Sequence, residues 1–458
     1  MTSSYLGLAA LDAFLLIAGL GALHGLGLVR SSRDALRHTG LAVVVGWAAV
    51  GIADSLALIL GAPLNRWVVA SFALAIAVAG VFVGRRVPSY RLRIVGESGA
   101  ASWVAVAGAA VLLVQLAALL RRALAAGAPT QWDAWTFWLP KARSIVEFGG
   151  LDTALGGFTS FANPGYPPLV PALEASAFTF MGNTTASPLA AQHWVIAVAF
   201  FGALASLLAV RVRPAILWPC LALLALLPTF TALIGSMLGD EPLMLLLGLG
   251  GACAALWLLE RNACYAALAG LFFAAAALAK NEGLPIALVI AATMLGAALV
   301  RRPRRPLAPA LVLLAPIAAL APWKLWLRIE DVHVSPDYRL SDLLNPGLLG
   351  DRFDRLSYGA RHLPTYIFST GHWLLAVPLM LAAAILVAPR RPALAVLALA
   401  PVVAVPAGLL VIYWIGYPPV DWYVATTADR VVASAVVLAT VFLPLLLAEA
   451  LRRDEPSP

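Results

Sequence analysis

Long apolar segments alternate with short polar ones along almost the whole chain. Most of these segments are long enough for a helix to cross ~30 Å of hydrocarbon, which takes roughly 20 residues. The pattern predicts membrane-spanning helices at 5–29, 41–63, 67–84, 103–120, 187–210, 214–234, 242–259, 264–279, 283–300, 307–328, 373–389, 392–416 and 431–450. We therefore expect an all-α polytopic membrane protein with about 13 transmembrane helices.

The composition excludes a soluble domain. Hydrophobic residues make up 62% of the 458 residues and charged residues only 12%, whereas soluble proteins carry about 25% charged residues. The net charge of +8 comes from arginines beside the apolar segments, which is typical of anchoring at the inner leaflet. We therefore expect membrane lipid, and no nucleic acid, as a partner. The cysteines, Cys220, Cys253 and Cys264, lie in or beside apolar segments without metal-ligand spacing.

Basic residues are concentrated in alternate loops. Eighteen of the 31 lysines and arginines fall in the loops that are cytoplasmic if the amino terminus lies outside, as the positive-inside rule requires. The orientation predicted is amino terminus out and carboxyl terminus in, as a multi-pass protein of the inner (plasma) membrane. Two long extracytoplasmic loops follow, at 121–188 and 328–372. The polar residues that could carry chemistry lie on this outer face.

The first outer loop contains two different patterns. In 131–148, QWDAWTFWLPKARSIVEF, tryptophans recur every third residue, which favours an amphipathic helix lying in the membrane interface, kinked at Pro140. In 161–171, FANPGYPPLVP, four prolines and a glycine favour an extended turn around Tyr166. A short apolar helix is predicted to follow at 172–181.

Asp133 is the first candidate for chemistry. It lies between Trp132 and Trp135 just beyond a predicted span, where partial desolvation suits a general base. The structural alternative is a helix cap, or an ion pair with Lys141 or Arg143.

Two adjacent acids, Asp240 and Glu241, form the second candidate. They stand at the predicted outer end of a span and are followed by Pro242. They are a candidate functional pair at the outer mouth of this span. As structural residues they would cap the helix and complement its dipole.

The third and fourth candidates could bind an anion. Lys280, Asn281 and Glu282 lie in a tight turn between two apolar spans, and Arg430 lies at the start of the last span. A lysine and an arginine at the membrane surface could hold a phosphate. The alternatives are a local salt bridge in the turn and a surface pairing of Arg430 with Asp429.

These motifs, in this order, resemble the GT-C superfamily of integral-membrane glycosyltransferases, in particular bacterial members related to protein O-mannosyltransferases and lipid A aminoarabinose transferases. The matching segments cover about 300 residues: WDAW with the following PKA (132–142), YPPLVP (166–171), GDEPL (239–243), KNEG (280–283) and TTADR (426–430).

The resemblance implies a catalytic base at Asp133 and a place in the site, or at a divalent metal, for Asp240 and Glu241. The resemblance is also compatible with a divalent metal cofactor, Mg²⁺ or Mn²⁺. Two features depart from the family pattern. The catalytic loop usually follows the first span, but here it follows the fourth, so we expect a three-helix extension at 1–100 and a GT-C-like catalytic domain at 101–458. The turn that often reads HPDYP is NPGYP here, at 163–167.

The function expected is transfer of a sugar from a polyprenyl-phosphate carrier to a lipid, glycan or protein acceptor on the extracytoplasmic face, with inversion. Asp133 would be the base, and Lys280 and Arg430 would bind the phosphate. The further substrate-binding candidates are Trp132, Trp135, Lys141, Tyr166, Asp240, Glu241, Asn281 and Glu282. The alternatives are a transporter or flippase of a lipid-linked substrate, favoured by Asp12 and Asp54 inside spans, and an inactive assembly partner.

Overall fold

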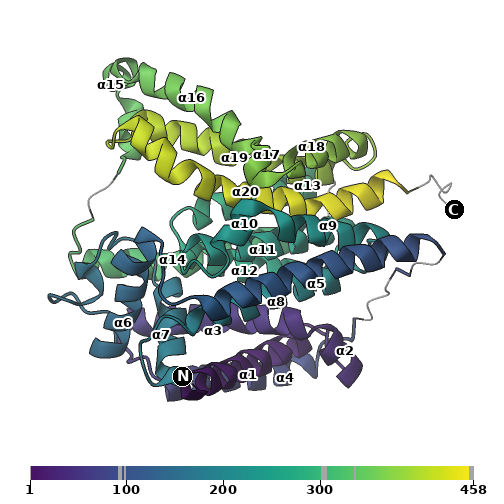
Figure 1. The fold of residues 1–458 in the computed structure, drawn as a ribbon, viewed down its shortest axis with the longest axis horizontal. Helices are drawn as coiled ribbons and strands as arrows, with labels where there is room; N and C mark the ends of the chain where they lie inside the picture. Colours follow the sequence, from purple (N-terminus) through teal and green to yellow (C-terminus); the bar gives the residue numbers. More distant parts are fainter. Residues whose placement is uncertain (1, 91–94, 97–98, 301–306, 335–336, 453–458) are drawn as a thin grey trace.

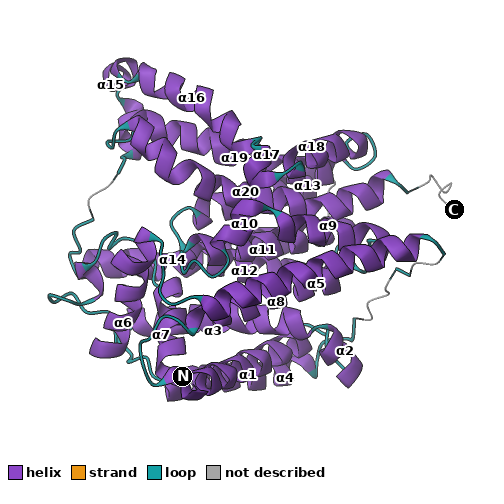
Figure 2. Ribbon diagram, viewed as in Figure 1, coloured by secondary structure: helices purple, strands orange, loops and turns teal. Residues whose placement is uncertain are grey.

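The computed structural model describes residues 2–90, 95–96, 99–300, 307–334 and 337–452. Within these ranges the regular structure is entirely helical, with no strand (Figure 2). The predicted all-α class is therefore confirmed. The arginine-rich segments 91–94 and 301–306, which contributed to the predicted orientation, lie outside the described residues.

The helices of the first half include one π-helical turn, η1, and one 3-10 turn, η2. They are α1 (Thr2–Gly25), α2 (Ser32–Arg37), α3 (Thr39–Ile59), α4 (Arg66–Gly84), α5 (Ala101–Ala125), η1 (Ala134–Trp138), α6 (Leu139–Phe148), η2 (Phe158–Ser160), α7 (Leu169–Met181) and α8 (Leu189–Leu208).

The second half contains the two most buried long helices, α11 and α20. Its elements are α9 (Pro214–Leu226), α10 (Pro228–Leu233), α11 (Asp240–Glu260), α12 (Ala263–Ala279), α13 (Gly283–Val300), α14 (Leu307–Ile329), η3 (Leu340–Leu344), α15 (Pro346–Asp351), α16 (Phe353–Ile367), α17 (Thr370–Trp373), α18 (Ala376–Val387), α19 (Pro392–Ile415) and α20 (Val420–Ala450).

Ten of the described helices are long and apolar enough to cross a membrane: α1, α3, α4, α5, α8, α11, α13, α14, α19 and α20. The chain is thus a polytopic membrane protein by the length and composition of its helices. The other three predicted spans correspond to apolar helices of 13, 17 and 12 residues, α9, α12 and α18. The total of 13 spans stays a prediction.

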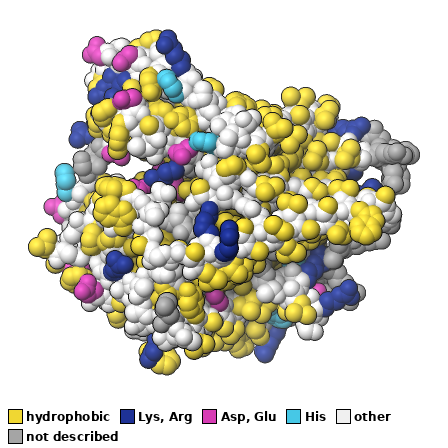
Figure 3. Space-filling view, in the orientation of Figure 1, with side chains coloured by type: hydrophobic (Ala, Val, Ile, Leu, Met, Phe, Trp, Pro, Cys, Tyr) yellow, Lys and Arg dark blue, Asp and Glu magenta, His cyan; other side chains and the backbone are white. Residues whose placement is uncertain are grey.

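The long helices run side by side and define two ends of the bundle (Figure 1). We call the end that carries α6, α7, α15 and α16 the loop end. The start of α1 lies at this end, whereas α2 and the end of α20 lie at the opposite end. In the space-filling view, hydrophobic side chains cover the broad middle of the molecule and most visible acidic side chains lie toward the loop end (Figure 3). This is the polarity expected of a protein whose middle contacts lipid.

Small residues allow α1 and α3 to approach closely. A Cβ at Gly19 would stand 1.7 Å from the carbonyl oxygen of Ala42, and one at Gly46 would stand 1.8 Å from that of Leu15. Glycine is therefore required at both positions, as in close helix pairs within membranes. Helix α3 also packs on α7, α8 and α12, so the amino-terminal helices share one apolar core with the rest of the bundle.

The segment 131–148 differs from the predicted amphipathic helix. Trp132 and Trp135 are exposed, whereas Trp138 is completely buried. The reason is the π-helical turn η1, which has more residues per turn than an α-helix, so residues three apart no longer share a face. Pro140 lies in the first turn of α6, where a missing N–H costs nothing. The short helix predicted at 172–181 is confirmed as α7.

Candidate functional site

Four charged side chains from distant parts of the chain meet at the loop end. Arg430 Nη2 lies 2.6 Å from Asp133 Oδ2 and 2.7 Å from Asp240 Oδ2. Lys280 Nζ lies 2.8 Å from the other oxygen of Asp240, Oδ1. We call Asp133, Asp240, Lys280 and Arg430 the ion cluster. The structure therefore brings together the leading candidate of each of the four polar motifs.

The surrounding helices explain how these side chains reach one another. Asp240 is in the first turn of α11, and Arg430 is inside α20, which packs along α11. Lys280 ends α12 with an extended backbone. On the side of Asp133, the Trp138 ring packs so closely on Gly239 that a Cβ there would lie 2.5 Å from it. This contact holds η1, and with it Asp133, against the start of α11.

The centre of the ion cluster is removed from solvent. Asp240 is 2% exposed and Lys280 5% exposed, while the side chains of Asp133 and Arg430 are 21% and 24% exposed. Burial alone would lower the pKa of Lys280, but the negative charges of Asp240 and Glu282 raise it above its usual value. Lys280 is therefore favoured as a cation, and Asp240 makes the largest contribution to this effect.

The two carboxylate partners of Arg430 engage only some of its N–H donors. Its Nε and Nη2 donate to Asp240, and Nη2 also donates to Asp133. Among the described residues, no hydrogen bond engages Nη1, so this nitrogen keeps its two N–H donors for a ligand. The alternative pairing with Asp429 is not formed, since Asp429 Oδ1 accepts instead from the backbone N–H of Arg430.

Tyr166 forms an aromatic wall beside the ion cluster. Its ring stacks on Phe137, with centroids 5.9 Å apart, and tilts against Trp138 at 5.4 Å. Lys280 Nζ lies 6.0 Å from the centroid of the Tyr166 ring, within reach of a cation–π interaction. Burial and the nearby carboxylates hold the pKa of Tyr166 well above its usual value, so the phenol stays protonated.

Lys141 does not join the ion cluster and does not pair with Asp133. It is completely buried, donates to the backbone carbonyl of Asn163 at 2.6 Å, and lies 5.4 and 5.0 Å from the ring centroids of Phe137 and Phe158. Burial lowers its pKa to about 7. Asn163 has a positive φ of 54°, so Lys141 fastens the strained start of the turn that carries Tyr166.

Glu241 points away from its neighbour Asp240. Its Oε2 lies 2.9 Å from His193 Nδ1 and accepts from the backbone N–H of Gly235 at 2.8 Å. Adjacent residues on a helix face different directions, so Asp240 and Glu241 do not form a pair of ligands as they stand. Among the described residues, no three His, Cys, Asp or Glu side chains are grouped as metal ligands, and the metal requirement stays a prediction.

The remaining substrate-binding candidates lie at the edge of the site. Trp132 and Trp135 are exposed and pack edge to face, with centroids 6.3 Å apart. Asn281 is exposed and accepts from Lys324 at 3.4 Å. Glu282 forms the expected local salt bridge with Lys280, at 3.2 Å. None of these contacts shows a role in binding, and their assignment stays a prediction.

Sequence reasoning missed His193 and Glu174, which lie in apolar helices next to the site. His193 binds Glu241, and Glu174 is 4% exposed with both carboxylate oxygens lacking a partner among the described residues. The available signal was a single ionisable residue in an otherwise apolar helix, which is costly and therefore often functional.

Comparison with known proteins gives no relative for this chain. No family model, curated protein or solved structure matches it. Its function is therefore inferred from the residues and the geometry alone.

Proposed function

We propose that the protein is a multi-pass membrane glycosyltransferase that moves a sugar from a polyprenyl-phosphate carrier to an acceptor hydroxyl. The observation that carries the proposal is the ion cluster, in which an accessible carboxylate, Asp133, stands beside two cations at the loop end of a membrane bundle. This combination supplies a base for the acceptor and positive charge for a leaving phosphate.

The reaction is a single displacement. The acceptor oxygen bonds to the anomeric carbon as the bond from that carbon to the phosphate oxygen breaks, and the bonding electrons leave with the phosphate. Asp133 takes the proton of the acceptor hydroxyl. Attack opposite to the leaving group inverts the anomeric centre, as in inverting glycosidases with water replaced by the acceptor.

The two cations would bind the leaving phosphate through donors that the carboxylates leave open. Arg430 offers Nη1, and Lys280, with three N–H donors, gives one to Asp240. Asp240 holds both cations in place in the absence of substrate. Because Arg430 also binds Asp133, phosphate binding at Arg430 would weaken that pairing and free Asp133 for the acceptor.

The membrane setting supports a lipid-linked donor. In the proposed arrangement the chain crosses the inner (plasma) membrane about 13 times, with the amino terminus outside, and the loop end is extracytoplasmic. Trp132 and Trp135, both exposed, would then lie at headgroup depth, where tryptophan is enriched, and could contact the polyprenyl chain or stack on the sugar. The acceptor is a lipid, glycan or protein on that face.

The test is a transfer assay in membranes with a panel of labelled polyprenyl-phosphate sugars, with and without Mg²⁺ or Mn²⁺. Asp133→Asn keeps the shape but removes the base, so transfer should fall ~10²-fold or more. Glu147→Gln, an exposed acid in the same loop, is the matched control and should retain full activity. Normal transfer by well-expressed Asp133→Asn protein would refute the assignment of the base.

A transporter or flippase of a lipid-linked substrate is the second candidate. It is favoured by acids within the amino-terminal helices, since Asp54 is completely buried in α3 and Asp12, half-buried in α1, accepts a hydrogen bond from Gln192. Movement of a labelled lipid-linked sugar across vesicles containing the protein, without transfer to any acceptor, would favour this function over the glycosyltransferase.

A further inference from the structure

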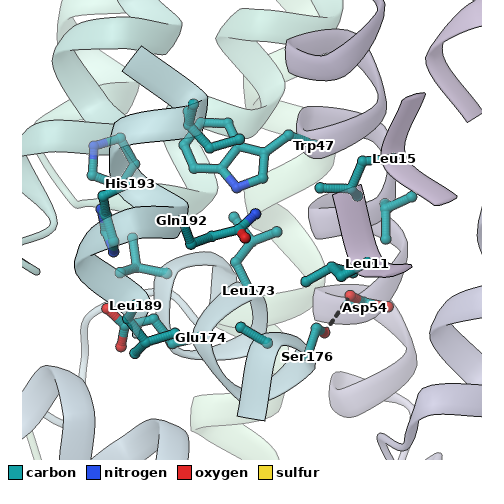
Figure 4. Close-up of a pocket in the computed structure, with 15 residues that line it drawn as sticks. Leu11, Leu15, Trp47, Asp54, Leu173, Glu174, Ser176, Leu189, Gln192 and His193 are labelled. Carbon is teal, nitrogen blue, oxygen red and sulfur yellow. Dashed lines mark hydrogen bonds between the residues drawn. The ribbon is translucent and has the colours of Figure 1, made fainter. Parts of the chain in front are cut away.

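A cavity lies inside the bundle between α1, α3, α7 and α8, beside the start of α11. Its lining combines apolar residues such as Leu11 and Leu15 with Asp54, Glu174, Gln192 and His193 (Figure 4). Its volume is about 40 Å³, more than one water molecule needs. The cavity is therefore large enough for a small ion or molecule.

Four buried acceptor atoms around this cavity are left without partners. They are Asp54 Oδ1, both carboxylate oxygens of Glu174, and Gln192 Oε1, none of which has a hydrogen-bond partner among the described residues. The three residues are 0%, 4% and 8% exposed. Buried polar groups in native proteins are nearly always satisfied, so these four oxygens point to an occupant that donates hydrogen bonds.

Two side-chain donors beside the cavity are already used. Ser176 Oγ donates to Asp54 Oδ2 at 2.9 Å, and Gln192 Nε2 donates to Asp12 Oδ1 at 2.6 Å. His193 is bound to Glu241. None of the lining residues in the described part of the chain is lysine or arginine. His193 is the one lining residue there that can carry a positive charge, and it is bound to Glu241, so it cannot by itself balance both Asp54 and Glu174.

The arrangement favours an ammonium ion over a metal ion. Asp54 and Glu174 stand at opposite sides of the cavity with Gln192 between them (Figure 4), so the acceptors approach from several directions. The described residues contain no group of three His, Cys, Asp or Glu side chains placed as metal ligands. An ammonium group presents N–H donors in every direction, and the aromatic ring of Trp47 in the cavity wall attracts cations as well.

We propose that the cavity binds a small N–H-donating cation, ammonium or the charged end of a short primary amine, through Asp54, Glu174 and Gln192. The cation supplies the charge and the donors that these buried side chains lack. The proposal does not depend on the glycosyltransferase activity. The site nevertheless adjoins the ion cluster, because His193 in the cavity wall binds Glu241, the neighbour of Asp240.

The test measures the thermal unfolding of the purified full-length protein in an ammonium-free buffer, with methylammonium, tetramethylammonium or sodium chloride added at constant ionic strength. Burial raises the pKa of Glu174 to about 8, so the titration is made at pH 8.5 to limit competition by protons. Methylammonium should raise the midpoint saturably, as a ligand of the folded state does. Tetramethylammonium, which has no N–H donor, and sodium should not.

Glu174→Gln and Asp54→Asn should each weaken the apparent affinity for methylammonium at least ~10-fold, while the exposed control Glu147→Gln keeps the wild-type response. If Glu174→Gln does not fold, Asp54→Asn decides. An equal response to tetramethylammonium or sodium would overturn the proposal, and so would a response that both cavity variants retain. Absence of any response in the wild type would also overturn it.

Discussion

Asp240 should be the side chain on which the stability of the loop end depends most. It is 2% exposed and accepts hydrogen bonds from Lys280 Nζ and from both Nε and Nη2 of Arg430. The substitution Asp240→Asn keeps the size but removes the negative charge. One amide oxygen can still accept from one of the two cations, while the amide N–H₂ group faces the other.

The size of the loss in unfolding free energy depends on which carboxylate partners each cation retains. Charge-assisted hydrogen bonds contribute about 1.5–3 kcal/mol each, and breaking one side of a buried ion pair costs about 3–5 kcal/mol. Arg430 keeps Asp133 and Lys280 keeps Glu282, at 3.2 Å, so the lower part of this range applies. We expect Asp240→Asn to lower the free energy of unfolding by about 3 kcal/mol, which is a factor of roughly 10² in the folding equilibrium.

The assay is reversible unfolding in mixed micelles for the wild type, Asp240→Asn, Lys280→Gln and the double variant. Because removing Lys280 removes one of the two cations that lose their bond to Asp240 in Asp240→Asn, the double variant should lose less than the sum of the single losses, by about 1–3 kcal/mol. Strict additivity would mean that Asp240 and Lys280 do not stabilise each other, and the charge argument for the ion cluster would then be wrong.

Two further outcomes can be measured. Burial lowers the pKa of Lys141 to about 7 in the folded protein, whereas an unfolded lysine has a pKa of about 10.4, so between these values only the unfolded state binds the extra proton. The wild type should therefore gain stability relative to Lys141→Met as the pH rises from 7 to 9, by at most about 1.4 kcal/mol per pH unit. Unfolding midpoints of the two proteins that shift in parallel with pH would contradict the burial of a neutral amine. The second outcome tests the predicted orientation of the chain in the membrane. Cysteines introduced at positions 160 and 345 should react with an impermeant reagent in intact cells, and one at position 303, outside the described residues, should react only after permeabilisation. Labelling of position 303 in intact cells would contradict the predicted orientation.

The sequence was sufficient to locate the long apolar helices because the bilayer imposes one strong requirement, a long apolar run for every crossing. Each predicted span coincides with a helix or, at 214–234, with the pair α9 and α10. The exact number of crossings is harder to predict, because α12, with 17 residues, is shorter than most spans and is itself buried in the bundle.

The contacts among the four residues of the ion cluster were only partly predictable from the sequence. Placing Asp133, Asp240, Lys280 and Arg430 on one face followed from counting arginines, but which acid would bind which cation depends on helix rotation. Composition does not determine rotation when a helix is apolar on all sides, as α11 is. For this reason the separation of Asp240 from Glu241 could not be read from the sequence, although the two residues are adjacent.

The prediction of an amphipathic helix for the Trp-rich segment 131–148 was wrong for a related reason. Its three-residue spacing predicts one face only if the backbone is α-helical, and no composition rule signals a single π turn. The same limit applies to Lys141, whose burial between two phenylalanine rings depends on the fold of the following turn.

The π-helical turn η1 has a consequence for insertions and deletions. Such a turn closes on the fifth residue where an α-helix closes on the fourth, so it holds one residue more than the α-helical turn it replaces. Deleting a single residue from 134–138 would allow α6 to continue as a regular α-helix and would turn Asp133, which lies before η1, by about 100° around the helix axis. The carboxylate would then leave Arg430. Substitutions in 134–138 preserve this register, whereas a one-residue deletion would change it, so Asp133 depends on the length of this segment as much as on its composition.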